Sequence, residues 1–191
     1  MKNNILLIIS LFAINLIASQ NLKLPSIFND NMILQQDSNI SIWGWSKSRS
    51  SISITVSWNE KTLITNSDDN GKWIINIKTP KSGKSHEISL KSGDQKISLS
   101  NILMGEVWIA SGQSNMQMNL KGYNNEPVLG ANDAIANSNN SEIRFFTVER
   151  NTSETKMENL EGNWSISNPE NSPSFSAVAY SFAKHLNTVL D

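Results

Sequence analysis

The sequence contains no cysteine and has two histidines among its 191 residues. The absence of cysteine excludes disulfides, thiolate metal sites and cysteine nucleophiles. The scarcity of histidine is also informative, because a nucleophilic serine usually needs a histidine as its general base. Within this chain His86 and His185 are the two candidates for that role.

A basic surface is also missing. The chain has 16 Lys and Arg residues against 17 Asp and Glu, which gives a formal net charge of −1. Since phosphate binding needs a basic face, no nucleic-acid partner is expected. The sequence has no metal-ligand cluster, no phosphate-cradling glycine loop and no cofactor motif, so neither a metal nor a cofactor is expected.

The N-terminus carries a long apolar run. A single lysine in "MKNN" precedes "ILLIISLFAINLIAS", residues 5–19. The run is short for a membrane span and fits the apolar region of a signal peptide, with Ala18 or Ser19 at the cleavage site. We therefore expect a signal peptide at 1–19 and an exported chain (periplasmic, cell-surface or extracellular) that has no stable membrane insertion after signal removal. An uncleaved membrane anchor is the alternative.

Residues 20–100 contain short runs of β-branched and aromatic residues. In "SISITVSW" apolar and polar residues alternate strictly, and in "DDNGKWIINI" a tight Asn70-Gly71 turn precedes a second alternating run. "HEISLKSGDQKISLS" repeats this design around Gly93-Asp94. Short strands at this spacing predict a small antiparallel β-sandwich, an accessory domain without a cluster of titratable groups.

The pattern changes after residue 100. The run "ILMGEVWIA" (102–110) is typical of a strand buried on both faces of a parallel sheet. Further elements are expected in this order: a short helix at 131–138, a strand at 143–149 and a helix at 175–190. Ser174 is the expected N-cap of the last helix. The apolar residues of this helix fall on one stripe: Phe175, Val178, Ala179, Phe182, Leu186, Val189 and Leu190.

The order strand, helix, strand, helix predicts an α/β unit. Two strands cannot form a parallel sheet with covered faces, because sheets usually have about five or six strands. We therefore expect 101–191 to be the N-terminal part of an incomplete α/β domain, in a chain that is a fragment of a longer protein.

Ser114 is the candidate nucleophile. In "VWIASGQSN" a predicted strand ends at a glycine turn, and a serine flanked by amide side chains follows. A serine needs a base that a carboxylate orients, together with amide donors for the oxyanion. The stretch is not the G-x-S-x-G elbow, because Met116 stands where the second glycine belongs. On its own chemistry Ser114 is also consistent with a simple polar turn.

Several stretches resemble the sialate O-acetylesterase family, whose catalytic domain is an SGNH-type hydrolase (flavodoxin-like α/β fold). They are "LPSIFNDNMILQQDSNISIWGW", "DDNGKWIINI", "LMGEVWIASGQSNMQM" and "GNWSISNPENSPSFSAVAYSFAKHL". The resemblance implies a serine hydrolase that releases acetate from O-acetylated sugars, typically sialic acids, through an acetyl-Ser114 intermediate. It also implies that the Ser114 N–H contributes to the oxyanion hole. Gln113 and Asn115 are candidate oxyanion or positioning residues, and their alternative role is to hold the turn by local hydrogen bonds.

Neither histidine is a convincing base. His86 begins a predicted strand and is expected at the surface, and His185 lies beside Lys184 on a solvated helix face. The resemblance implies that the catalytic His and its acidic partner lie beyond residue 191. The isolated chain is therefore expected to hydrolyse acetyl esters very slowly or not at all.

Two other functions remain open. The β domain could be a non-catalytic, exported carbohydrate-binding module, whose stacking faces would come from Trp43, Trp45, Trp58 and Trp73. Alternatively, the protein could be an acetyl esterase that acts on other acetylated polysaccharides.

Overall fold

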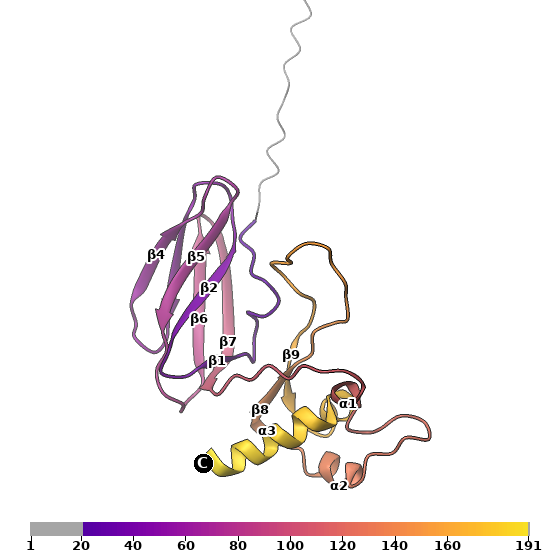
Figure 1. Cartoon of the computed structure of the whole chain (residues 1–191). Helices are drawn as coiled ribbons and strands as arrows, with labels where there is room; N and C mark the ends of the chain where they lie inside the picture. Colours follow the sequence, from indigo (N-terminus) through magenta and orange to yellow (C-terminus); the bar gives the residue numbers. More distant parts are fainter. Residues whose placement is uncertain (1–20, 191) are drawn as a thin grey trace, which may run out of the picture.

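The structure is a computed structural model that describes residues 21–190 (Figure 1). The predicted signal peptide at 1–19 lies outside the described residues. Residues 21–105 form a β-rich part, here named the β module, and residues 106–190 form a second part, here named the hairpin–helix unit. Figure 1 shows the β module above and the labelled elements of the hairpin–helix unit, coloured red to yellow, below it.

The β module contains seven of the described strands: β1 (Ile33–Gln35), β2 (Asn39–Trp45), β3 (Ser51–Val56), β4 (Thr62–Asn66), β5 (Lys72–Lys78), β6 (His86–Ser92) and β7 (Gln95–Gly105). Five of them form a sheet in the order β1-β7-β6-β3-β4, and β2 pairs separately with β5. Because β1 runs parallel to β7, the larger sheet is mixed and not wholly antiparallel as predicted. Alternation along a strand identifies its buried face but does not fix the direction of its neighbours.

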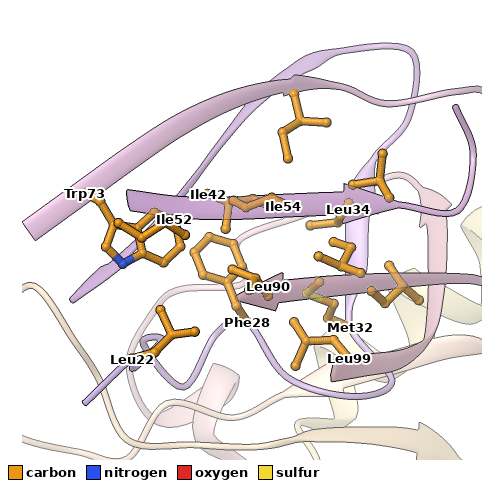
Figure 2. Packing of buried hydrophobic residues seen from close by; sticks show 14 of the residues in the cluster. Leu22, Phe28, Met32, Leu34, Ile42, Ile52, Ile54, Trp73, Leu90 and Leu99 are labelled. Atoms are coloured by element: carbon orange, nitrogen blue, oxygen red, sulfur yellow. The ribbon is translucent and has the colours of Figure 1, made fainter. Parts of the chain in front are cut away.

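Both sheets contribute to one hydrophobic core (Figure 2). The predicted alternation in β3 is confirmed, since Ile52, Ile54 and Val56 are fully buried. Figure 2 shows side chains from segments as distant in sequence as Leu22 and Leu99 gathered in the same packed layer. The hydrophobic effect therefore joins the two sheets into one body.

The turn at Asn70-Gly71 connects the two sheets and does not close a hairpin within one of them. Gly71 has a φ of 80°, and the Asp68 carboxylate accepts hydrogen bonds from the backbone N–H groups of Asn70 (2.9 Å) and Lys72 (2.8 Å). β4 pairs with β3, whereas β5 pairs with β2. The strand expected after the turn is confirmed as β5, with Trp73 buried.

The hairpin–helix unit contains the remaining elements: α1 (Ser114–Gln117), α2 (Ala131–Ala136), β8 (Asn140–Phe146), β9 (Trp164–Ser167), the 3-10 turn η1 (Ser172–Ser174) and α3 (Ala177–Leu190). The expected short helix, second strand and last helix correspond to α2, β8 and α3. β8 pairs with β9 in an antiparallel hairpin, so the described part of this unit has no parallel strand pair. Within residues 21–190, no helix combines the length and the apolarity that a membrane span requires.

The strand predicted at 102–110 ends at Gly105. The first half of this apolar run completes β7, where Ile102 and Met104 are buried, so the predicted boundary at residue 100 falls inside a strand. The second half forms no strand, and Trp108 and Ile109 are 61% and 93% exposed. No described strand lies beside this half to pair with its backbone, which explains the difference from the prediction.

α3 begins later than predicted, and the face that it buries overlaps the predicted stripe only in part. Ser176 caps it, because its hydroxyl accepts a hydrogen bond from the backbone N–H of Ala179 (3.3 Å), whereas the predicted cap Ser174 belongs to η1. The buried side chains of α3 are Ala177, Ala179 and Tyr180. Much of the predicted apolar stripe is exposed, namely Val178, Phe182, Val189 and Leu190.

Polar contacts dock the hairpin–helix unit onto the β module. The Arg144 guanidinium of β8 donates to the backbone carbonyl of Asn101 and, at 3.1 Å, to its side-chain oxygen. The indole N–H of Trp164 in β9 donates to the Ile27 carbonyl at 2.8 Å. Burial at this junction lowers the pKa of Arg144 from its ordinary value. Both strands of the hairpin are therefore fixed to the module that precedes Ser114.

Gly44 tests the packing between β2 and β5. A Cβ at this position would overlap the Lys23 carbonyl oxygen and lie 2.8 Å from the Trp73 ring. We expect Gly44→Ala to lower the free energy of unfolding, measured by urea denaturation, by about 1–3 kcal/mol or more. Gly105→Ala is the matched control, because its Cβ would meet Ile33 at an ordinary 3.6 Å. Equal stability of the two variants would contradict this packing.

His86 makes the stability of the β module depend on pH. Burial lowers the pKa of His86 from its ordinary 6.5, and the charge of Lys84 lowers it further. Below pH 6.5 the unfolded chain binds a proton that the folded chain does not yet bind. The free energy of unfolding should therefore be at its full value above about pH 7 and fall as the pH decreases through 6.5 and lower.

Denaturation curves measured across this range should show a weaker pH dependence for His86→Gln than for the wild type. The control is His185→Gln, which alters an exposed residue of α3 and should keep the wild-type profile. A His86→Gln profile parallel to that of the wild type would contradict the assignment.

Candidate active site

Ser114 opens the single-turn helix α1. The turn is closed by two backbone hydrogen bonds of 3.0 Å, from the Gln117 N–H to the Gln113 carbonyl and from the Met118 N–H to the Ser114 carbonyl. Ser114 is exposed, and its hydroxyl makes no hydrogen bond within the described residues. The structure therefore presents a solvent-accessible serine on a short, internally bonded turn.

Gly112 allows the chain to approach α1 closely. A Cβ on Gly112 would lie 3.0 Å from the Cβ of Met116, which is tighter than ordinary van der Waals contact. The glycine that was predicted to end the strand is thus needed for close packing against the helix that carries Ser114.

A backbone bridge holds this turn against the start of α3. The Leu120 N–H donates to the Phe175 carbonyl, and the Ala177 N–H donates to the Met118 carbonyl, both at 2.8 Å. The Ser176 hydroxyl also contacts the Met116 sulfur at 3.4 Å. The segments "GQSNMQM" and "FSAVAYSFAKHL", distant in sequence, therefore form one local structure.

Two further side chains contact the C-terminal end of α1. The Tyr123 hydroxyl donates to the Gln117 carbonyl at 2.8 Å, and the Arg150 guanidinium donates to the Gln117 side-chain oxygen at 3.3 Å. Sequence reasoning missed both residues, because they lie in loops whose path is set by tertiary packing.

Gln113 and Asn115, the candidate oxyanion or positioning residues, flank Ser114 on the exposed surface. Neither side chain makes a hydrogen bond within residues 21–190, and Gln113 does not cap α1 with its side chain. The alternative role of holding the turn therefore has no bond to support it. The two amides remain available to a ligand at Ser114.

The two histidines lie in different parts of the fold. His86, expected at the surface, is 6% exposed; its Nδ1 lies 3.1 Å from the Ser57 hydroxyl and its ring packs edge-on against Trp58. His185 is exposed on α3. Neither residue hydrogen-bonds to Ser114, so the described part of the chain brings no base to the serine.

Glu106 lies where the chain leaves β7 toward Ser114. Its carboxylate accepts hydrogen bonds from the side-chain amides of Gln36 (3.0 Å) and Gln35 (3.1 Å), and these bonds lower the pKa of Glu106 from its ordinary value. The carboxylate is thereby tied to β1 in its charged form. Within residues 21–190 no three His, Asp or Glu side chains group closely enough to hold a metal ion.

None of the four candidate tryptophans of the β module is fully exposed, and Trp43, Trp45 and Trp58 are half-buried. Trp73 is buried, Trp43 packs edge-on against Phe28 at 4.7 Å between ring centroids, and Trp58 donates its indole N–H to the Lys78 carbonyl. Among the described tryptophans, Trp108 is the one with a large exposed surface, and it lies outside the β module. The sugar-stacking role considered for the module therefore loses its main support.

Comparison with curated proteins gives relatives of one kind. The sialate O-acetylesterases of Homo sapiens and Pongo abelii are each 26% identical to this chain over 185 residues, which covers 88% of the chain and 35% of each relative. The enzyme of Rattus norvegicus is 25% identical over 186 residues, covering 88% of the chain and 33% of the relative. The resemblance to the sialate O-acetylesterases is confirmed. The chain spans about a third of the length of these relatives, and no family model matches it.

A solved structure gives the same result at the level of the fold. A carbohydrate acetylesterase from Xanthomonas citri superposes with a TM-score of 0.82 at 27% sequence identity, covering 88% of this chain and 38% of that protein. The mixed sheet and the few helices described above are therefore similar to part of a carbohydrate acetylesterase.

Exposure of residues 107–109, which lead toward Ser114, predicts that substitutions there have little effect on stability. Ile109→Ser should change the free energy of unfolding of the chain by less than about 0.5 kcal/mol, since Ile109 is 93% exposed. The matched variant Ile54→Ser changes a fully buried isoleucine and should cost more than about 3 kcal/mol. Chemical denaturation measures both, and a large loss in Ile109→Ser would mean that residues 107–109 are packed in a core.

Proposed function

We propose that this chain carries the nucleophile of an exported serine carbohydrate O-acetylesterase of the sialate O-acetylesterase type. The observation that carries the proposal is the placement of Ser114. It lies exposed on a turn that backbone hydrogen bonds join to Phe175 and Ala177, within a chain that is similar over 88% of its length to named esterases.

The chemistry proposed for Ser114 is acyl transfer. Its Oγ attacks the acetyl carbonyl, and the proton of the hydroxyl passes to a general base. The negative charge that develops on the carbonyl oxygen is stabilised by the Ser114 N–H, with Gln113 and Asn115 as candidate further donors. The protonated base gives its proton to the sugar oxygen, which leaves as a hydroxyl, and water activated by the same base then hydrolyses the acetyl-Ser114 ester to release acetate. These steps need no cofactor.

The base and its acidic partner are proposed to come from residues beyond 191. In support, neither described histidine is bonded to Ser114, and the relatives are about three times as long as the matched region. The exposed residues 107–109 and the uncovered stripe of α3 further support the proposal that 101–191 is the N-terminal part of an SGNH-type, flavodoxin-like α/β domain. On this proposal the β module is a sandwich-type accessory domain, and the isolated chain is inactive.

The substrate class has two candidates. The names of the curated relatives favour O-acetylated sialic acids. The name of the Xanthomonas citri structure favours acetylated carbohydrates in general. Both candidates use the same acyl-enzyme chemistry at Ser114, so residues around the sugar must decide between them.

Acetate release by the natural polypeptide that contains residues 1–191 tests the proposal. With an O-acetylated sugar as substrate, Ser114→Ala should lower kcat by at least about 1,000-fold, because the covalent route is lost. Ser111→Ala is the matched control, since Ser111 is also exposed and lies three residues earlier in the chain. Equal activity of the two variants would overturn Ser114 as the nucleophile.

A further inference from the structure

A pocket of about 250 Å³ lies against one face of the β8–β9 hairpin. Phe145 pairs with Ser165 in this hairpin. Thr147 and Asn163 lie one residue beyond the ends of β8 and β9 and two positions from that pair. If the alternation of side chains along a strand continues there, they share the face of that pair. All four residues line the pocket.

Glu149 extends this face beyond the assigned strands. Its backbone N–H donates to the Glu161 carbonyl at 3.0 Å, so the two chains remain paired past the end of β8. Glu149 is again two positions from Thr147 and also lines the pocket. Phe175 also lines the pocket, and its ring stacks on Phe145 with 4.0 Å between centroids.

Four polar side chains that line the pocket are free to bind a ligand. Within the described residues no hydrogen bond or ion pair involves the side chains of Thr147, Glu149, Asn163 or Ser165. Together they offer a carboxylate that accepts, an amide that donates and accepts, and two hydroxyls that do both. A pocket with an apolar wall and a few convergent polar groups is the usual form of a small-ligand site, and this set matches the hydroxyls of a sugar ring.

Hydrogen bonds connect segments that line the pocket to the segment that follows Ser114. The backbone carbonyl of Phe175 accepts a hydrogen bond from the Leu120 N–H. Arg150, the residue after Glu149, donates to the side-chain oxygen of Gln117 at the end of α1. Two segments that line the pocket are thus hydrogen-bonded to the segment that starts at Ser114. A sugar ring bound in the pocket would contact segments that are hydrogen-bonded to residues 117–120, which follow Ser114 in the chain.

We infer that this pocket is a subsite for a neutral sugar ring of an O-acetylated glycan. The inference rests on the proposed function and narrows its substrate class. Glu149 is the one ionisable residue that lines the pocket, and no cation lines it. The carboxylate of a sialic acid would therefore meet a like charge, whereas the hydroxyls of a neutral hexose can donate to Glu149.

Ligand binding in the absence of turnover tests the inference. The natural polypeptide carrying Ser114→Ala is titrated by calorimetry with an O-acetylated methyl hexoside and, separately, with an O-acetylated methyl sialoside. We expect the hexoside to bind at least about tenfold more tightly. Glu149→Ala, and separately Asn163→Ala, should each weaken hexoside binding by about tenfold, because each removes a hydrogen bond to the ring.

The matched control is Glu154→Ala, which removes an exposed carboxylate of the same loop outside the pocket and should leave the Kd unchanged. Glu149→Gln keeps the shape of the side chain and separates loss of charge from misfolding. Tighter binding of the sialoside, an unchanged Kd in Glu149→Ala, or no saturable hexoside binding up to about 50 mM would each overturn the inference.

The two proposals can fail separately. Hexoside binding that depends on Glu149, together with acetate release that survives Ser114→Ala, would overturn the nucleophile and leave the subsite. Acetate release that depends on Ser114, together with a hexoside Kd that is unchanged in Glu149→Ala and Asn163→Ala, would overturn the subsite alone.

Discussion

The backbone bridge between 118–120 and 175–177 is the constraint on which the candidate site depends. Two hydrogen bonds of 2.8 Å attach the turn of Ser114 to the start of α3, which itself packs on β8 through Tyr180 and its neighbours. Without this bridge α1 would be a single helical turn on an exposed loop, and so short a helix is not stable alone. The bridge instead holds the turn of Ser114 at a defined position beside the start of α3.

The β module provides a rigid base for this arrangement. Its core joins both sheets, and β7 carries the chain from that core directly to Glu106, where the path toward Ser114 begins. The same module holds the hairpin through Arg144 and Trp164. The β module therefore anchors both the segment that leads to Ser114 and the β8–β9 hairpin.

Local patterns in the sequence predicted local structure. Alternation identified β3 and β5, because burial on one face of a strand imposes that pattern. Periodicity identified α3 as a helix, although much of its apolar stripe is exposed. The patterns could not give the parallel pairing of β1, the change of sheet at Gly71 or the exposure of Ile109, because each depends on which distant segments lie nearby. For the site, the sequence pointed to Ser114, whereas the Phe175 contact and the pocket at Glu149 required the tertiary structure.

The central claim is that Ser114 becomes acetylated during turnover. The most direct measurement is mass spectrometry of the natural polypeptide, quenched in acid during hydrolysis of an O-acetylated sugar and then digested. The account predicts an acetyl group on Ser114, absent when substrate is omitted and absent in Ser114→Ala. An acetyl group trapped on another residue, with Ser114 unmodified during active turnover, would contradict it.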